Sequence, residues 1–298
     1  MQTKLLFIQA LSSLQPGTGQ GVGVIDQPVS REKATGLPYL PGSTIKGVLR
    51  DCWELENILN LEEVFGQTTK AADPYAGSVS MMDGRLLLLP VRSLAGVFAW
   101  VTSPFILNRL IRDCKMCNIQ AGLPAVVTGL ANNQVLLTQS PALKLTPQIN
   151  RVILEDIEID VAPATTVADG WAGWLANAIQ PNDLAWQADF KKRFCIVSDD
   201  VMSYFSESAT EVTPRIRIDD DTKTASGQAL WYEESLPAET FLVSLAVAQQ
   251  VKAAPQIVFD GLSKIVKKPV QFGGGATVGK GLCKLYLYDS VPGNTVQP

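Results

Sequence analysis

The chain has 298 residues, of which 46% are hydrophobic and 18% are charged, and its net charge is -4. This length and composition predict one elaborated domain or two, and they exclude a disordered chain. The five cysteines are an odd number scattered along the sequence, which does not suggest a secreted disulfide framework, so we expect a cytoplasmic protein. No apolar run reaches the roughly 18 residues that a membrane span needs, so no membrane contact is expected.

Histidine is absent from the sequence. Because histidine is the commonest general acid or base and a frequent metal ligand, serine-histidine triads, cysteine-histidine dyads and histidine-based zinc sites are excluded. The acidic net charge argues weakly against non-specific DNA binding, although an acidic protein can still carry one basic groove.

The first third of the chain predicts three elements in order. Residues 3–11 read as a buried strand, and the glycine-rich residues 14–26 after it form a loop. A helix then begins at Ser43, a natural N-cap. Its apolar residues recur at helical spacing on one face. They are Ile45, Val48, Leu49, Cys52 and Trp53.

The middle of the chain is less regular. Two apolar runs flank Asp83-Gly84, a dipeptide that predicts a tight hairpin. Residues 93–113 predict a helix that is kinked or divided at Pro104. From about 115 to 185 the sequence is rich in Pro, Asn, Gln and Thr, which predicts an irregular insertion with one strand in 151–161.

The last third predicts a helix near 183–207, a long hairpin at about 212–235 and a helix at 255–267. A glycine-rich loop and a closing strand end the ordered pattern. Strand, helix, hairpin, helix and strand is the order of an α+β ferredoxin-like or RNA-recognition-type fold with large insertions. We see no repeat or linker, and we expect residues 1–298 to form a single elaborated domain.

A local excess of cations lies between residues 17 and 51. Arg31, Lys33, Lys46 and Arg50 have only Glu32 between them, and the helix start near Ser43 adds free backbone amides and a positive dipole end. This combination suits phosphate. A solvated helix with ordinary surface charges is the alternative.

Asp26 ends the glycine-rich loop. A carboxylate there could orient or deprotonate a ribose 2′-hydroxyl, or hold a hydrated divalent cation near a phosphate. On the residues alone, an aspartate before a proline-containing turn is more often a turn former.

The loop 272–281 contains part of a phosphate-loop pattern, because Gly274, Gly279 and Lys280 fit it. Gly281 stands where Ser or Thr must bind magnesium, and the next segment reads as a strand, so the pattern fails. A glycine loop that approaches an RNA backbone and a structural turn remain equal interpretations. Cys114 and Cys117 form a lone pair without further ligands, which makes a zinc site improbable.

The predicted hairpin at 212–235 carries two kinds of charge. Asp219–Asp221 could bind a metal, but a turn is the more economical account. Arg215, Arg217 and Lys223 would give the hairpin one basic side, and we expect Arg215 and Arg217 to bind RNA.

Taken together, five segments resemble the RAMP superfamily, and within it the backbone subunits of type III-B CRISPR effectors. Their order spans nearly the whole chain, which makes the match more specific than any single motif. The segments are residues 26–51, 64–66, 81–104, 215–237 and 272–281.

This resemblance implies a modified RNA-recognition fold whose copies stack as a filament along a CRISPR guide RNA. The implied partners are the guide RNA, a complementary single-stranded target RNA, other copies of the chain and the other subunits of the Cmr effector complex. Each copy pushes a thumb hairpin, here expected at 212–235, between guide and target. The implied activity is cleavage of the target RNA at regular intervals.

The resemblance also implies roles for particular residues. Asp26 corresponds to the residue that cleaves the target with a divalent metal, Mg²⁺ or Mn²⁺, which it binds. Lys46 corresponds to a position that contacts the guide. Further residues implied along the guide are Arg31, Lys33, Ser43, Arg50, Gly273, Gly274 and Gly275.

One position departs from the family pattern, because relatives often carry a histidine where this chain has Gln15. Any cleavage must therefore use Asp26 without an imidazole from this chain. Two alternatives stay open. They are a non-catalytic RNA-binding scaffold and, more remotely, a nucleotide-binding transferase that uses Asp219–Asp221 and the loop 272–281.

Overall fold

The computed structural model of the chain describes most of its length. It covers residues 1–17, 25–67, 75–146, 148, 150–163, 165–218 and 225–288.

The described helices and strands alternate along the chain. The helices are α1 (Gly42–Leu55), α2 (Leu61–Phe65), α3 (Pro104–Met116), α4 (Val167–Ile179), α5 (Leu184–Arg193), α6 (Asp199–Ser208) and α7 (Pro255–Ile265). The strands of the first half are β1 (Gln2–Ala10), β2 (Tyr39–Leu40), β3 (Val79–Met81), β4 (Gly84–Arg92), β5 (Phe98–Thr102) and β6 (Gln134–Leu137). The later strands are β7 (Arg151–Leu154), β8 (Ile157–Val161), β9 (Phe194–Val197), β10 (Glu211–Ile218), β11 (Ala225–Ser235), β12 (Phe241–Ala248), β13 (Val270–Gln271) and β14 (Leu282–Tyr288).

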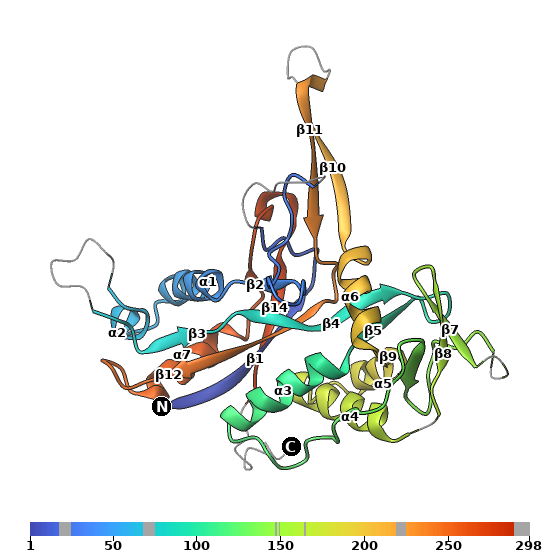
Figure 1. Ribbon diagram of the computed structural model, residues 1–298. Helices are drawn as coiled ribbons and strands as arrows, with labels where there is room; N and C mark the ends of the chain where they lie inside the picture. The colour runs from blue at the N-terminus through green and yellow to red at the C-terminus, as the bar shows by residue number, and fades with distance from the viewer. Residues whose placement is uncertain are drawn as a thin grey trace.

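One large mixed sheet forms the body of the molecule (Figure 1). Its middle strands run in the order β14-β1-β12-β4 and are all antiparallel. Because α1 lies between β1 and β4 in sequence and α7 between β12 and β14, this part has the order of a ferredoxin-like core. The α+β fold expected from the sequence is therefore confirmed.

The core strands are covered on both faces. In β1 every residue from Leu5 to Ala10 is buried, a continuous run that is typical of a strand with both faces covered. Helix α1 packs against β3 and α7, whereas α3 and α4 pack against β1, β4 and β14. The predicted apolar face of α1 is also confirmed, since Ile45, Leu49 and Trp53 are fully buried.

The long hairpin expected at 212–235 is present as the separate two-stranded sheet β10-β11. It projects from the body like a finger in Figure 1, and Arg215 pairs with Trp231 across it. Direct neighbours across an antiparallel pair share a face, so Arg215, Trp231 and Glu233 lie on the same side of the ribbon. Asp219–Asp221 and Lys223 lie outside the described residues, as does the side chain of Arg217.

The hairpin predicted at Asp83-Gly84 is wrong. Strands β3 and β4 do not pair with each other, because both pair with β12 as successive parts of one edge. Asp83 interrupts this edge and its Oδ1 accepts a hydrogen bond from the backbone N–H of Gly42 at 2.7 Å. The aspartate therefore caps α1, and Ser43 lies in the first turn instead of at the N-cap, which is Pro41.

The helix predicted over 93–113 is also only half correct. Residues 98–102 form β5, which pairs with β4 and β9, and the helix begins at Pro104. Proline suits the first helical turn because its missing N–H is not needed there. The aromatic and β-branched residues before it favour a strand once neighbouring strands are available.

The irregular segment expected at 115–185 contains more structure than its composition predicts. It holds β6, the hairpin β7-β8 and helix α4, and the expected single strand in 151–161 is two strands that meet at Glu155, whose φ is +50°. The helix predicted near 183–207 is interrupted by β9, a buried run inside the sheet. The helix at 255–267, the closing strand and the strand at 3–11 are confirmed within two residues.

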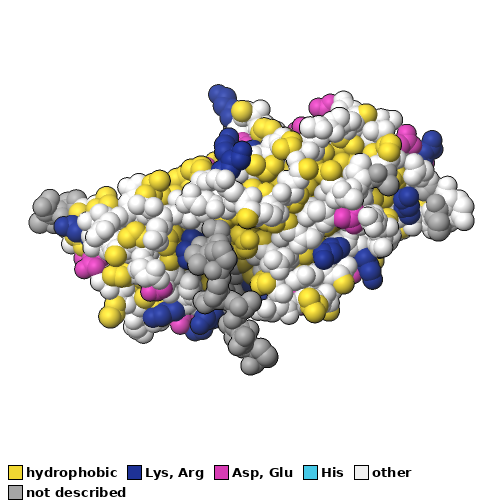
Figure 2. Space-filling model, turned by 90° about the horizontal axis from the view of Figure 1, so that it is seen from below, with side chains coloured by type: hydrophobic (Ala, Val, Ile, Leu, Met, Phe, Trp, Pro, Cys, Tyr) yellow, Lys and Arg dark blue, Asp and Glu magenta, His cyan; other side chains and the backbone are white. Residues whose placement is uncertain are grey.

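The part of the chain that the structure describes contains no helix with the length and hydropathy needed to cross a bilayer. On the face seen from below, Lys and Arg side chains stand in small separate groups among uncharged and hydrophobic side chains (Figure 2). That face therefore shows no continuous basic field for a nucleic acid.

Candidate nucleic-acid interface

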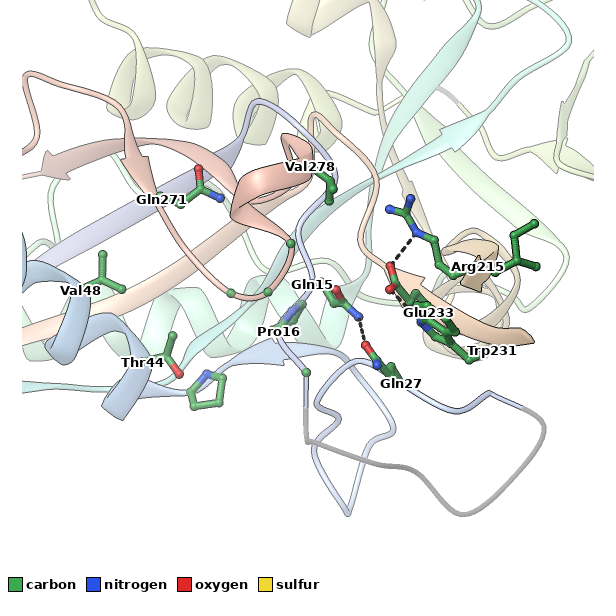
Figure 3. Close-up of a pocket in the computed structure, with 16 residues that line it drawn as sticks. Gln15, Pro16, Gln27, Thr44, Val48, Arg215, Trp231, Glu233, Gln271 and Val278 are labelled. Carbon is green, nitrogen blue, oxygen red and sulfur yellow. Dashed lines mark hydrogen bonds and ion pairs between the residues drawn. The ribbon is translucent and has the colours of Figure 1, made fainter. Parts of the chain in front are cut away.

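A cleft of about 860 Å³ lies at the base of the hairpin. Four segments that are far apart in sequence form its walls: the loop around Gln15, the start of α1, the hairpin residues Arg215 and Trp231, and the loop Gly273–Gly275 (Figure 3). Three of these segments carry residues that the sequence predicts to bind RNA. Folding therefore brings the predicted site segments together at one surface.

Asp26 is exposed and directly precedes Gln27, which lines the cleft, but Asp26 itself is not in the lining. Its Oδ2 accepts a hydrogen bond from the backbone N–H of Tyr232 at 2.8 Å. The Nε2 of Gln15 donates to Oε1 of Gln27, the residue after Asp26, at 3.2 Å (Figure 3). The carboxylate is thus fixed in direction by the hairpin and still open to solvent.

Glu234 of the hairpin binds the loop that carries Asp26. Its side chain is buried, and its two oxygens accept from the backbone N–H of Val29 at 3.0 Å and from Arg31 at 2.6 Å. Arg31 also donates to the carbonyl of Gly36 at 2.9 Å. The sequence predicts that Arg31 contacts RNA, but two of its guanidinium nitrogens are engaged inside the protein.

Glu233 lies on the opposite, cleft-facing side of the ribbon and collects three donors. Arg215 donates to it at 3.2 Å, Lys280 at 3.0 Å and the indole of Trp231 at 3.0 Å. Burial by itself would raise the pKa of Glu233, but the hydrogen bonds from Trp231, Lys280 and Arg215 hold it below its usual value. The carboxylate is therefore charged, and it offsets the two cations of this wall.

The glycine loop approaches the N-terminal loop closely. Gly273 has a φ of +72°, and a Cβ there would stand 2.3 Å from the carbonyl oxygen of Gln15. No other residue type fits this position without moving the backbone. The N–H of Gly274 donates to the same carbonyl at 3.0 Å, so this hydrogen bond joins two of the segments that line the cleft. The failed phosphate-loop pattern is consistent with β14, because a strand follows where a helix is required.

The start of α1 forms the remaining wall through Pro41, Thr44 and Val48. The positive end of the helix dipole lies on this side, although the carboxylate of Asp83 already accepts the N–H of Gly42 there. Lys46 is half-buried, and burial together with the neighbouring Arg50 lowers its pKa. Arg50 donates to the carbonyl of Gly66 at 2.6 Å.

The predicted residues therefore fall into two groups. Arg215 and Gly273–Gly275 line the cleft, whereas Lys33, Ser43, Lys46 and Arg50 lie on neighbouring exposed or half-buried surface outside its lining.

Sequence reasoning missed several residues of the cleft. Trp231 follows an apolar run that reads as strand core, and Glu233 has the appearance of an ordinary surface charge. Gln27 and Gln271 carry no motif at all. Lys280, which donates to Glu233 behind the lining, stood in a recognisable pattern, but the two residues are 47 positions apart in sequence.

The donor set around Asp26 limits the kind of metal that fits. No group of three or more His, Cys, Asp or Glu side chains converges within the described ranges. A single exposed carboxylate fits a hydrated Mg²⁺ or Mn²⁺ that takes its other ligands from water and RNA phosphates. It does not fit a metal held by the protein alone.

The pair Cys114 and Cys117 receives no support as a metal site. Cys114 and Cys117 are buried, and burial, followed by the charge of Cys117, raises the pKa of the Cys114 thiol to about 12. A buried neutral thiol is a poor metal ligand.

Comparisons with known proteins agree with this geometry. The sequence profile of the RAMP superfamily matches residues 7–284. The CRISPR system Cmr endoribonuclease Cmr4 of Pyrococcus furiosus is 35% identical to this chain, and the alignment covers 96% of each protein.

Solved structures give the same relationship. Oligomeric Cmr4 from Pyrococcus furiosus has a TM-score of 0.76 at 28% identity, covering 98% of this chain and 100% of that one. A chain of the type III-B Cmr-beta complex bound to cognate target RNA has a TM-score of 0.72 at 19% identity, covering 96% and 97%. At that identity the second match supports the fold alone.

Proposed function

This chain belongs to the RAMP superfamily, and on that premise we propose that it is a repeated backbone subunit of a type III-B CRISPR ribonucleoprotein. It binds guide RNA along a filament of its own copies, together with the other subunits of the Cmr complex, and it cleaves complementary single-stranded target RNA. Identity of 35% to a named endoribonuclease along 96% of the chain supports RNA cleavage. We place the protein in the cytoplasm, because five cysteines scattered along the chain do not suggest a secreted disulfide framework.

The observation that carries this proposal is the cleft, because it joins the loop beside Asp26, the start of α1, the hairpin base and Gly273–Gly275. Backbone amides and glycine loops that allow close approach suit an RNA backbone. We place the guide across the start of α1, with Lys33, Ser43, Lys46 and Arg50 along its path. Since Arg31 is engaged by Glu234, it supports the Asp26 loop instead of gripping RNA.

The hairpin β10-β11 is the thumb of this proposal. Its base carries Trp231, whose ring lines the cleft and offers a surface for a base. Arg215 and, by sequence, Arg217 supply its basic side. A base held out of the stack at this point would expose the ribose and phosphate of the neighbouring link.

The chemistry requires little more than positioning. Attack of a ribose 2′-hydroxyl on the adjacent phosphate is favoured when the two groups are aligned in line. Asp26 is held by Tyr232 and can orient the hydroxyl or accept its proton. A hydrated Mg²⁺ or Mn²⁺ near Asp26 would supply charge neutralisation at the phosphate. Gln15 can hold a group by hydrogen bonding but cannot transfer its proton as histidine does.

The test is an Asp26→Ala exchange in the complex assembled on a guide RNA. We expect guide and target binding to stay intact and the cutting rate to fall by at least about 100-fold, the usual size of a positioned acid-base contribution. The readout is a gel of labelled complementary RNA with magnesium or manganese added. Asp260→Ala, an exposed carboxylate change on α7, is the matched control and should cut normally.

Two results separate the alternatives. Unchanged cutting by the Asp26→Ala complex contradicts the catalytic assignment. No cutting by the unaltered complex, with target binding intact, favours the non-catalytic scaffold.

A further inference from the structure

A second hollow, of about 440 Å³, lies on the other side of the hairpin base and shares no lining residue with the RNA cleft. Its walls are largely apolar and include Phe98 and Pro237. Its rim carries the carboxylates Glu155, Glu211 and Glu239.

A strained residue stands at the edge of this hollow. Val97 has a φ of +74°, in the left-handed region that β-branched residues strongly avoid, yet 75% of its surface is exposed. Glycine would adopt this backbone without strain. Leu94 in the same turn is 66% exposed. An apolar side chain that costs strain and packs little against its own chain is expected where it contacts another molecule.

The charge of the rim decides what kind of molecule fits. Three carboxylates surround the hollow, and the only cation in its lining is Arg92, which lies 3.5 Å from Glu155. The guanidinium of Arg193 also stacks on the wall residue Phe98, but the carboxylates outnumber the cations, so this surface is a poor fit for RNA phosphates. It fits a protein surface that presents apolar side chains with cations beside them.

The same chain carries such a surface on the outer face of α3. Phe105 and Met116 are 40% and 54% exposed, and Arg112 between them is 64% exposed. Lys115 is exposed beside them, and the spacing of these residues places them along one side of the helix. The carboxylate of Asp113 on this helix is buried and pairs with Arg85. It also lies 4.0 Å from Nε of Arg112, but the Arg112 side chain stays 64% exposed.

We propose that the acidic hollow of one copy receives the outer face of α3 of the next copy. The inference rests on the proposed function, in which copies line up on a guide RNA. Because the two surfaces are different parts of the chain, the contact is head-to-tail, and it can repeat from copy to copy along a guide RNA. Figure 1 places α3 on the lower side of the body, away from the hairpin base, so one copy can use both surfaces at once.

Charge reversal tests this contact directly. The first variant is Glu155→Lys with Glu211→Lys, and the second is Arg112→Glu with Lys115→Glu. Either variant alone places like charges across the contact, so loading a second copy onto a long guide RNA should need at least about tenfold more protein. An equal mixture of the two variants restores opposite charges at every contact and should load as the unaltered protein does. Mass photometry of the complexes on RNA counts the copies.

The controls separate this inference from the proposed function. Glu54→Lys with Glu62→Lys, an equal charge change on exposed residues of α1 and α2, should load normally. Binding to RNA long enough for one copy should be unchanged in all variants. If the unaltered protein does not bind RNA long enough for one copy, the proposed function is overturned. If the charge variants bind that RNA and also load a second copy as easily as the unaltered protein, only the head-to-tail contact is overturned.

A Val97→Gly variant gives an independent readout. Removing the strained side chain should leave the Tm of the monomer equal or higher, while the loading of a second copy weakens. A lowered Tm with unchanged loading would assign Val97 to the fold and contradict its place in the contact. A mixture of charge variants that fails to load would contradict the contact between the hollow and α3.

Discussion

At the scale of single residues, Glu234 has the largest structural consequence for the proposed chemistry. It is buried, it accepts from the backbone of Val29 and the side chain of Arg31, and Thr210 donates to it at 2.9 Å. Arg31 and Glu234 are 203 residues apart in sequence. The carboxylate of Glu234 therefore holds the loop that carries Asp26 against the hairpin. The same hairpin contacts Asp26 through the backbone N–H of Tyr232.

Glu234→Gln should loosen this loop. An amide keeps one acceptor but leaves the half-buried Arg31 without its ion pair, so we expect a loss of about 1–3 kcal/mol in the free energy of unfolding. Target cutting should fall more than guide binding, because the loop orients Asp26. Urea titration and single-turnover cleavage measure the two effects. Glu207→Gln, on the exposed side of α6, is the control, and equal results for both variants would contradict the role given to Glu234.

The residue scale also shows which parts of the site a sequence can reveal. The cation-rich segment and Gly273–Gly275 were predicted because their residue types are local. The ion pair of Arg31 could not be predicted, because its partner Glu234 is 203 residues away in sequence. Glu233 and Trp231 could not be predicted for the same reason. Their contacts form only when the hairpin packs against the N-terminal loop and the glycine loop.

At the scale of elements, the contact of α1 with α7 holds the first helix in place. Gly261 faces the ring of Trp53, and a Cβ at this position would stand 1.8 Å from it. The indole of Trp53 is fully buried and donates to the carbonyl of Leu59 at 2.9 Å, so it cannot move aside easily. The start of α1 at the cleft therefore depends on a glycine in another helix.

Gly261→Ala should destabilise the protein by about 1–3 kcal/mol through overpacking. Gly47→Ala, in α1 with nothing within 4 Å of the added Cβ, should instead stabilise it by about 0.5–1 kcal/mol. Thermal unfolding of the two variants measures these opposite signs. Shifts of the same sign and size would contradict the packing described for α1 and α7.

Elements were predicted best where a pattern is complete within the segment. Helices α1 and α7 show an apolar face at helical spacing, and β1 is a single apolar run. The sequence of β5 predicts a helix, because its pairing with β4 and β9 cannot be seen in the segment itself. Asp83-Gly84 has the composition of a hairpin turn, but no hairpin forms there because both flanking strands pair with β12.

At the scale of the whole molecule, the sheet continues beyond the ferredoxin-like part. Strands β5, β9, β6, β8 and β7 extend it on the side of β4, and they come from the sequence between β4 and β12. The hairpin leaves from the same stretch of sequence. We propose that the chain is one elaborated domain, because a single apolar core runs through both parts of the described structure.

The central claim is that each copy grips the guide and cuts the target once, at its own Asp26. The most direct measurement maps the cuts in end-labelled target RNA, using complexes assembled from mixtures of unaltered and Asp26→Ala subunits. We expect evenly spaced cuts that all fade in proportion to the fraction of the variant, with no change in spacing. Full cutting at every position in complexes made only of the variant would contradict it.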